Sequence, residues 1–413
     1  MNQLPPNFIF LARHSNDIDH AVPVIWGLLR KGIDAARIRY IALFPDPSID
    51  PSADARLRFL ASLGITLEEP HLRTRAAKSL RWLGSHAPAA WIRRHVTKFL
   101  YRQNAHSETN IDAVLTAIGD SPERTVIVSD HHNHPVLQHL RQAAQQKKAV
   151  MVALPHGFQL HRGFSDPATQ EALGENAMDG ASAKHFDQFL MCAAPDDARN
   201  SGKVLALGTP RFSPEWLEVL SQIYPVAQDS GTRLKVLFLL EKAGTYAGGR
   251  FWEWIDTEQQ FAALRFLAEH PGIELRIKGN ARGIAGRQAK LLRPYRHALA
   301  DDACPTNPLI TWADLVVGCC SSVVMDAYVR DKPVLLLEYA TRLKMVFKEF
   351  GFLENPGSHA RFTELVNKLI ERRGENLYDP ALLQRLIRHY VYAGKEPHSV
   401  VDAYAEFLIS LAN

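Results

Sequence analysis

Runs of Val, Leu and Ile, each followed by a turn and a helical pattern, recur along this chain and limit it to one class of fold. Such runs are typical of strands buried on both faces of a parallel sheet. The predicted strands are residues 7–12, 39–44, 125–130, 149–157, 186–194, 204–207, 233–242, 273–279, 314–320 and 333–339. Apolar residues at helical spacing lie between most of them. The sequence therefore predicts an α/β protein whose parallel sheets are covered by helices.

Chain length and proline content indicate two domains. The 413 residues exceed what one hydrophobic core usually supports. One alternating series ends and a second begins around residues 208–231, where Pro210, Pro214 and Pro225 gather. We therefore expect an N-terminal domain over residues 1–208, a C-terminal domain over residues 209–385, and a helical segment over residues 386–413 that packs back across the junction.

Composition is that of a globular protein, with 46% hydrophobic and 22% charged residues. No stretch approaches the ~20 consecutive apolar residues that span a bilayer. The first residues lack the basic segment of a signal peptide, so the short apolar run that follows is interpreted as a strand. The four cysteines follow no metal-ligand spacing, which favours reduced thiols in a cytoplasmic protein.

A basic stretch over residues 70–107 contains no acidic residue and interleaves its cations with aromatic side chains. One interpretation is a surface that binds anionic lipid headgroups and holds the protein at the inner face of the membrane. The other is a pair of core-packing helices with a solvated basic face. Nucleic acid is the least favoured partner, because no signature of an RNA- or DNA-binding module accompanies the stretch.

The turn GCCSSVVMDA, residues 318–327, is the strongest candidate for a binding site. A buried strand ends at Cys320, and Ser321 and Ser322 open a helix whose first N–H groups lack intrahelical partners. One of the serines could cap this helix. Alternatively, both could hold a phosphate group at the carboxyl edge of a parallel sheet, where open α/β sheets bind their ligands.

Basic residues follow other strands of the second half and could serve the same anion. Lys242 and Arg250 flank the glycines of EKAGTYAGGR, which could let backbone N–H groups approach a pyrophosphate. Lys278 ends another predicted strand, and Arg211 lies at the domain junction. Each is more often a surface cation, but their recurrence at strand ends favours a binding role.

Histidines and one aspartate supply the catalytic candidates of the first half. His156 follows a buried strand, and it is either a general base or a loop histidine bonded to backbone. His14 and Asp17 follow the first strand. The cluster HHNH (131–134) is too tightly spaced for a convincing set of metal ligands, so no metal is expected.

With these residues in order, the chain resembles the GT-B superfamily, and within it the CDP-glycerol glycerophosphotransferases and the capsule or surface-polysaccharide transferases. The segments that carry the resemblance are PHG (155–157), GTPR (208–211), RIK (276–278) and SSVVMDA…KPVLLLEY (321–339). The resemblance implies two Rossmann-like domains that face each other across a cleft. The donor would bind the C-terminal domain, without a metal or other cofactor.

The resemblance also implies roles for individual residues. Ser321 and Ser322 would contact the donor phosphates, with Glu338 of the same segment in the donor site. His156 would activate an acceptor hydroxyl group. Basic groups would stabilise the leaving nucleotide. Gly279-Asn280 departs from the His-Pro pair that relatives often carry after the basic strand, which leaves the donor nucleotide and the activity open.

Three functions are compatible with these features. The first is transfer of a glycosyl or glycerophosphoryl group from a nucleotide-activated sugar or glycerol donor to a polysaccharide, glycan or lipid-linked acceptor. The second is an isomerase similar to UDP-N-acetylglucosamine 2-epimerase, which the sequence favours less because it offers no evident set of cleft carboxylates for moving a carbon-bound proton. The third is a non-catalytic binding or scaffold protein of polysaccharide assembly, which the missing His-Pro pair favours.

Overall fold

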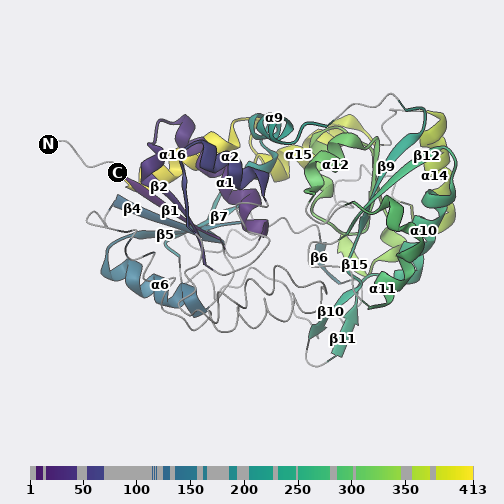
Figure 1. Cartoon of the computed structure of the whole chain (residues 1–413), viewed down its shortest axis with the longest axis horizontal. Coiled ribbons are helices and arrows are strands. Elements are labelled where there is room, and N and C mark those ends of the chain that lie inside the picture. Colours follow the sequence, from purple (N-terminus) through teal and green to yellow (C-terminus); the bar gives the residue numbers. More distant parts are fainter. Residues whose placement is uncertain are drawn as a thin grey trace. The chain divides into compact units, whose positions relative to one another are not determined.

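The chain folds into two α/β units in a computed structural model (Figure 1). Unit 1 comprises Met1–Gly157, Met178–Ile223 and His389–Asn413, and unit 2 comprises Phe158–Ala177 and Tyr224–Arg388. The structure describes residues 6–12, 15–43, 54–68, 114, 116, 118, 124–130, 135–155, 161–164, 186–192, 204–226, 231–247, 250–279, 286–300, 304–345, 356–372 and 378–412. The basic stretch 70–107 and the histidines at 131, 132 and 134 lie outside the described residues.

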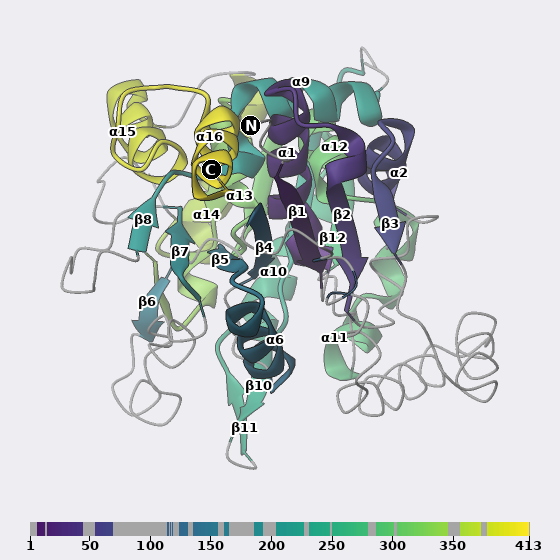
Figure 2. The same cartoon turned by 90° about the vertical axis from the view of Figure 1, so that its left-hand side faces the viewer.

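Unit 1 is built on a seven-stranded sheet in the order β3-β2-β1-β4-β5-β7-β8, and each of its strand pairs is parallel (Figure 2). Its strands are β1 (Asn7–Ala12), β2 (Ile38–Ala42), β3 (Thr66–Glu68), β4 (Thr125–Asp130), β5 (Val150–Leu154), β7 (Gln188–Met191) and β8 (Val204–Ala206). The sequence placed β1 and β4 at these same bounds and located four of the others to within a few residues. The short edge strand β3 was not predicted.

Helices cover both faces of the unit 1 sheet. On one face, α1 (Ser15–Arg30) packs against α16 (Val400–Ala412), and both contact the sheet. On the other face, α6 (Pro135–Gln146) buries Leu140 and Ala144 against residues of the central strands. Beside α1 lie η1 (Ala35–Arg37), α2 (Ala55–Ser62) and α9 (Pro214–Ile223). Gly27 permits the close approach of α1 and α16, because a Cβ there would lie 2.6 Å from Val401 Cγ1.

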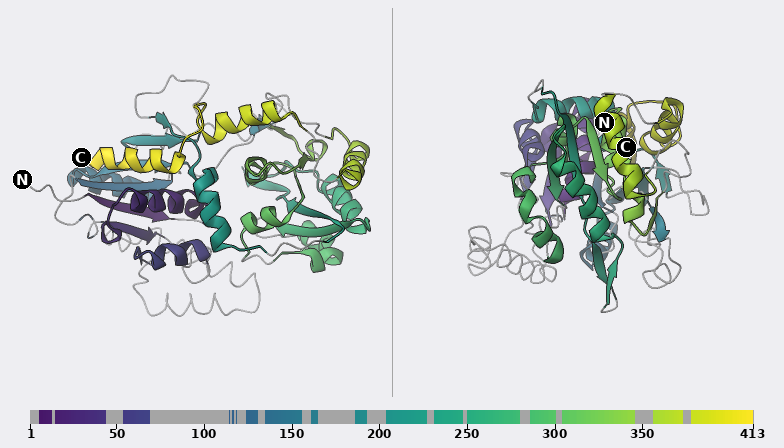
Figure 3. Two further views of the ribbon diagram at one scale, coloured as in Figure 1. Left: turned by 90° about the horizontal axis from the view of Figure 1, so that it is seen from above. Right: turned by 90° about the vertical axis from the view of Figure 1, so that its right-hand side faces the viewer.

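The segment Gly208–Arg211 anchors the end of the chain to unit 1. The Tyr404 hydroxyl group of α16 donates to the Gly208 carbonyl oxygen at 2.8 Å. Thr209 donates its N–H to the carbonyl of Val391 at 2.9 Å and its hydroxyl to that of Tyr390 at 2.7 Å. Helix α16 consequently lies alongside α1, as the left panel of Figure 3 shows. The GTPR motif therefore has a structural role, whatever else it does.

Unit 2 contains a four-stranded parallel sheet in the order β12-β9-β13-β14, seen in the right panel of Figure 3. Its strands are β9 (Leu234–Leu240), β12 (Ile273–Gly279), β13 (Leu315–Gly318) and β14 (Val334–Leu336). All four were predicted, and β12 has the predicted bounds. In this order β12, the strand that follows β9 in the chain, lies on one side of β9, and β13 lies on its other side.

Helices also cover both faces of this sheet. Helices α10 (Thr257–Glu269) and α14 (His359–Glu371) pack together over one face, where Phe238, Leu264 and Phe362 belong to one buried apolar cluster. Helices α12 (Thr306–Trp312) and α13 (Val324–Val329) contact β9, β13 and β14. Other helices described in this part of the chain are α11 (Gly286–Leu291), η5 (Arg293–Ala298) and η6 (Glu338–Ala340). Helix α15 (Pro380–Val391) begins in unit 2 and ends in unit 1. The two-domain α/β architecture predicted from the sequence is thus confirmed.

Two small antiparallel pairs complete unit 2 and were not predicted. Strand β6 (His161–Phe164) pairs with β15 (Leu343–Met345). Strands β10 (Gly244–Ala247) and β11 (Arg250–Glu253) form a hairpin. The segment EKAGTYAGGR was interpreted as a flexible glycine loop, and for the most part that was wrong: its Thr245 and Tyr246 pair with Trp252 and Phe251 as strand residues.

Candidate functional site

The strand order of unit 2 places a topological switch point between β9 and β13. In open α/β sheets, ligands bind beyond the carboxyl ends of the two strands where the chain reverses its direction of travel, because the flanking connections run to opposite faces and leave a crevice. Glu241 and Lys242 directly follow β9, and Cys319 to Ser322 directly follow β13. The switch point therefore gathers one carboxyl group, one ammonium group, two thiols and two hydroxyls.

The serine turn does not cap the helix that follows it. Helix α13 begins at Val324, its N-cap residue is Val323, and no side-chain capping hydrogen bond is made. The backbone carbonyls of Ser321 and Ser322 accept from the N–H groups of Val324 and Met325, both at 3.2 Å. The capping alternative is therefore not what the structure shows. Both serines are half-buried, so their hydroxyls can bond to groups at this edge.

Glu241 is the partner of Ser321 and was not identified from the sequence. Its half-buried carboxyl group forms a side-chain hydrogen bond with Ser321. Burial raises the pKa of Glu241 to about 7, against a smaller lowering from the Ser321 hydrogen bond. This carboxyl group is therefore partly protonated near neutral pH, which is unusual for a glutamate.

Two buried glutamines support Glu241 from the helical side. The Gln288 amide nitrogen of α11 donates to the Glu241 backbone carbonyl at 2.8 Å and lies 3.3 Å from the Gln260 amide oxygen. The Gln260 amide nitrogen of α10 lies 3.5 Å from the sulfur of Cys319. Gln260 is 0% exposed and Gln288 is 7% exposed, so this chain of amides fixes the end of β9 against α10 and α11.

The two thiols at this edge are poorly suited to nucleophilic chemistry. Burial, and next the nearby Glu241 carboxyl group, raise the pKa of Cys319 and of Cys320 well above that of an ordinary thiol. Neither cysteine forms a disulfide. We therefore interpret both residues as small side chains that pack at the end of β13.

Two of the three basic candidates of unit 2 lie at the carboxyl ends of neighbouring strands, and the third lies in the hairpin. The Lys242 ammonium group lies 5.8 Å from the centre of the Trp254 ring, within range of a cation–π interaction. Lys278, on β12, pairs in register with Leu239 of β9 and is 8% exposed. Arg250 begins β11, in the hairpin. Lys242 therefore follows a strand of the switch point itself, whereas Lys278 lies one strand away from it, on β12.

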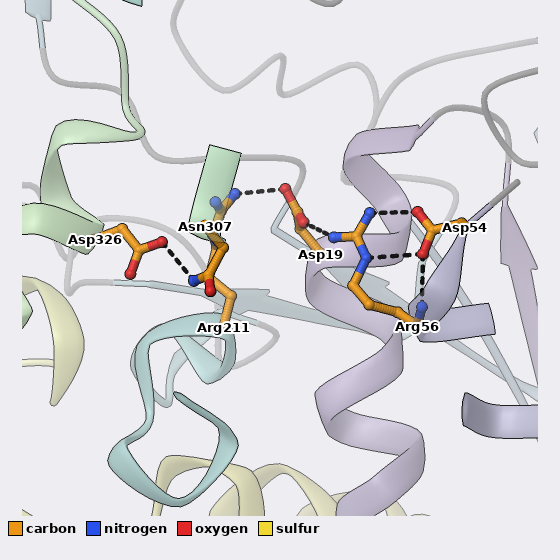
Figure 4. A network of polar contacts seen from close by, with 6 residues as sticks. All are labelled: Asp19, Asp54, Arg56, Arg211, Asn307 and Asp326. Atoms are coloured by element: carbon orange, nitrogen blue, oxygen red, sulfur yellow. Dashed lines mark hydrogen bonds and ion pairs between the residues drawn. The ribbon is translucent and has the colours of Figure 1, made fainter. Parts of the chain in front are cut away.

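Two acidic residues of this region have different surroundings. Glu338 opens η6, directly after the strand that neighbours β13, and is half-buried. Asp326 on α13 is 3% exposed and accepts from Asn307 Nδ2 at 2.7 Å (Figure 4). It also accepts from Arg330 Nε at 3.0 Å. Both carboxylate oxygens of Asp326 are thus bonded to protein groups, so we interpret Asp326 as a clamp between α12 and α13.

Arg211 lies in unit 1 and is engaged there by Asp19. The Arg211 guanidinium donates to Asp19 Oδ2 at 2.8 Å, and Arg56 bonds to Asp19 and to Asp54 (Figure 4). Burial acts to raise the pKa of Asp19, but the two arginines together hold it below its ordinary value. Arg211 is therefore part of a partly buried ion network that joins α1, α2 and η4 (Pro210–Phe212).

Of the catalytic candidates, only Asp17 falls among the described residues. It is 5% exposed in the first turn of α1, just past the carboxyl end of β1. His14 and His156 lie outside the described residues. Within the described ranges, no three His, Cys, Asp or Glu side chains are grouped so that they could hold a metal ion.

Comparison with solved structures supports the fold. No model of a known protein family matches the chain, and no curated protein matches it in sequence. A UDP-N-acetylglucosamine 2-epimerase superposes with a TM-score of 0.55 at 10% identity, covering 99% of this chain and 95% of that one. The Neisseria meningitidis UDP-GlcNAc 2-epimerase bound to UDP-GlcNAc gives 0.53 at 13% identity, covering 98% and 100%. The wall teichoic acid polymerase TagF gives 0.52 at 12% identity, covering 99% and 90%.

These similarities, together with the two parallel sheets and their covering helices, establish an α/β architecture of the GT-B type. Sequence identities this low support a shared fold, but they do not establish which reaction the chain catalyses. Among the described residues, no helix is both long enough and apolar enough to cross a membrane.

Proposed function

We propose that the chain is a transferase that moves a glycosyl or glycerophosphoryl group from a nucleotide-activated donor to a surface polysaccharide or glycolipid acceptor. The observation that carries the proposal is the polar turn at Ser321 and Ser322, which follows β13 at the switch point of the unit 2 sheet. Enzymes of the same fold include a UDP-GlcNAc 2-epimerase bound to UDP-GlcNAc and a wall teichoic acid polymerase.

In this proposal the donor phosphates bind at the serine turn, where the two hydroxyls donate to phosphate oxygens. Lys242 follows β9, the strand beside the turn, and Lys278 lies on β12, the next strand beyond β9. In this proposal the two ammonium groups offset the negative charge that develops on the leaving nucleotide. Glu338 contacts the donor from the neighbouring strand end. Arg250 and Arg211 remain candidates from the sequence, although Arg211 would have to exchange its bond to Asp19 for one to the ligand.

The acceptor side of the proposal rests on unit 1. His156 is the proposed base that removes the proton of an acceptor hydroxyl group, and His14 and Asp17 are proposed to assist it from the end of β1. The basic stretch 70–107 is proposed to hold the enzyme at an anionic membrane surface, where a lipid-linked acceptor would reside. We propose that no metal ion takes part.

A thermal-shift panel of UDP, CDP, CMP and GDP tests the donor site. A nucleotide present at ten times its dissociation constant stabilises the native state by about 1.4 kcal/mol, or about 3 to 5 °C for a unit of this size. The double substitution Ser321→Ala and Ser322→Ala should abolish the shift without lowering the melting temperature of the free protein. Ser410→Ala on α16, where the hydroxyl group is exposed, is the matched control. If no nucleotide produces a shift, the proposal is wrong.

Epimerisation is the second candidate, because two of the solved structures described above are UDP-GlcNAc 2-epimerases. Incubation of the protein with UDP-GlcNAc alone separates the two reactions. A transferase leaves this compound intact or slowly hydrolyses it, whereas an epimerase converts it to its 2-epimer, which is resolved by NMR. Nucleotide binding without any turnover, with or without acceptor, would instead favour the scaffold protein.

A further inference from the structure

Glu241 lies where the proposed function needs an anion to bind. It directly follows β9, and its carboxyl group is hydrogen-bonded to Ser321, one of the two serines proposed to hold phosphate. An ionised carboxylate in that position would repel a phosphate group and would compete for the same hydroxyl. The proposed phosphate site is compatible with this neighbouring carboxyl group only if the group can lose its charge.

The surroundings of Glu241 favour the neutral form. Gln288 holds its backbone, Gln260 and Cys319 lie beside it on the helical side, and Ser321 bonds to its carboxyl group. Neighbouring elements bring further titratable groups to this edge. From the strand ends come Lys242 after β9, Lys278 on β12, and Cys319 and Cys320 after β13. From the helices come Glu338 and Tyr339 on η6 and the ion pair of Glu258 on α10 with Arg287 on α11. Burial has the largest effect on Glu241 and raises its pKa to about 7, against a smaller lowering by the hydrogen bond with Ser321.

We propose that Glu241 contacts the ligand at the serine turn, and that a phosphate-bearing ligand binds there only when this carboxyl group carries a proton. Each binding event then takes up one proton from solvent onto a carboxyl oxygen. The resulting O–H group donates a hydrogen bond to a phosphate oxygen, so the carboxyl group changes from a repulsive acceptor to a donor. This inference rests on the proposed function, since it assumes that a phosphate group binds at Ser321.

The proposal makes nucleotide affinity depend on pH. Above pH 7 the protonated fraction of Glu241 falls about tenfold for each pH unit, and the affinity for a nucleotide falls with it. Glu241→Gln keeps the shape of the side chain and supplies an amide donor without charge. At pH 8.5 this variant should therefore bind UDP about 30-fold more tightly than the native protein, with an affinity that changes little between pH 7 and 8.5.

Isothermal titration calorimetry with UDP tests the inference. Titrations of the native protein at pH 7.5 and 8.5, each in two buffers of different ionisation enthalpy, measure the protons taken up. The expected result is an uptake approaching one proton at pH 8.5. This measurement needs no variant, so it holds even if a substitution disturbs folding. The UDP phosphate itself titrates with a second pKa of about 6. Its contribution to the measured protons is the same for every protein compared, so it cancels in the comparison.

Glu241→Gln should show no proton uptake, and Glu364→Gln, an exposed position on α14, should behave as the native protein does. If UDP binds with no proton uptake, or if the native protein and Glu241→Gln have the same pH dependence, the inference about Glu241 is wrong while the proposed donor site stands. If neither protein binds any nucleotide of the panel at any pH, the proposed function is wrong and this inference with it.

Discussion

The protonation of Glu241 also predicts how the stability of the ligand-free protein depends on pH. Its pKa is about 7 in the folded protein and 4.5 for an ordinary glutamate, so the native state binds the proton more tightly than the unfolded state does. By linkage, stability falls as pH rises between these two values and is constant above the higher one. At about 1.4 kcal/mol for each pH unit, the full loss is about 3 kcal/mol.

Glu241→Gln removes this titration. The variant should gain about 2 to 3 kcal/mol relative to the native protein between pH 5 and pH 8, because the native protein pays the cost of a buried charge over that range. Urea denaturation at pH 5, 6, 7 and 8, followed by circular dichroism, measures the difference. For Glu364→Gln, on the exposed face of α14, the free energy of unfolding should change with pH as it does for the native protein.

A constant difference between Glu241→Gln and the native protein from pH 5 to pH 8 would refute the reasoning. It would mean that the carboxyl group is solvated enough to keep an ordinary pKa, and the inference about proton uptake would lose its physical basis. The measurement uses no ligand, so it is independent of whether the protein binds a nucleotide.

Three further predictions concern contacts that hold each unit together, and urea denaturation measures all of them. Gly208→Ala should cost about 3 kcal/mol, because its φ is +97° and the new Cβ would lie 2.1 Å from the Val391 carbonyl oxygen. Gly32→Ala, with φ +82° and no atom within 4 Å, should cost only about 1 kcal/mol, and equal losses would contradict the role of the close contact. Tyr404→Phe should cost about 1 kcal/mol through the lost bond to the Gly208 carbonyl, and an unchanged midpoint would argue against that bond. Asp326→Ala should cost about 2 kcal/mol, since it leaves the half-buried Arg330 guanidinium without its carboxylate, and a loss below 1 kcal/mol would show that the clamp is dispensable.

Three strands were predicted with their correct bounds, because turn residues and helical patterns mark their ends in the local sequence. NFIFLA, TVIVSD and IELRIKG each became a strand over the predicted residues. The hairpin of β10 and β11 was missed because Gly244 and the Gly-Gly pair at 248–249 suggested a loop, whereas the alternation of Thr, Tyr, Phe and Trp around them is a hairpin pattern. The pairing of β6 with β15 joins distant segments, and short strands of this kind leave no local signal.

The candidate site was predicted in part. The serine turn lies at the carboxyl edge of an inner parallel strand, as the sequence indicated. Glu241 was missed because a glutamate after a strand is usually exposed. Arg211 was assigned to the donor site by its motif, but nothing in the sequence reveals its partner Asp19, which comes from the other end of unit 1.

The sequence by itself determined the two α/β units, the positions of most strands and the polar turn after β13, because apolar periodicity and strand ends are local properties of a chain. Only the tertiary structure decided what that turn contacts. The parallel pairing of β9 with β13 brings Glu241 close to Ser321, and Gln288 of α11 holds the Glu241 backbone carbonyl. Burial is a property of the assembled fold, and here burial turns an ordinary glutamate into a group that titrates near neutral pH.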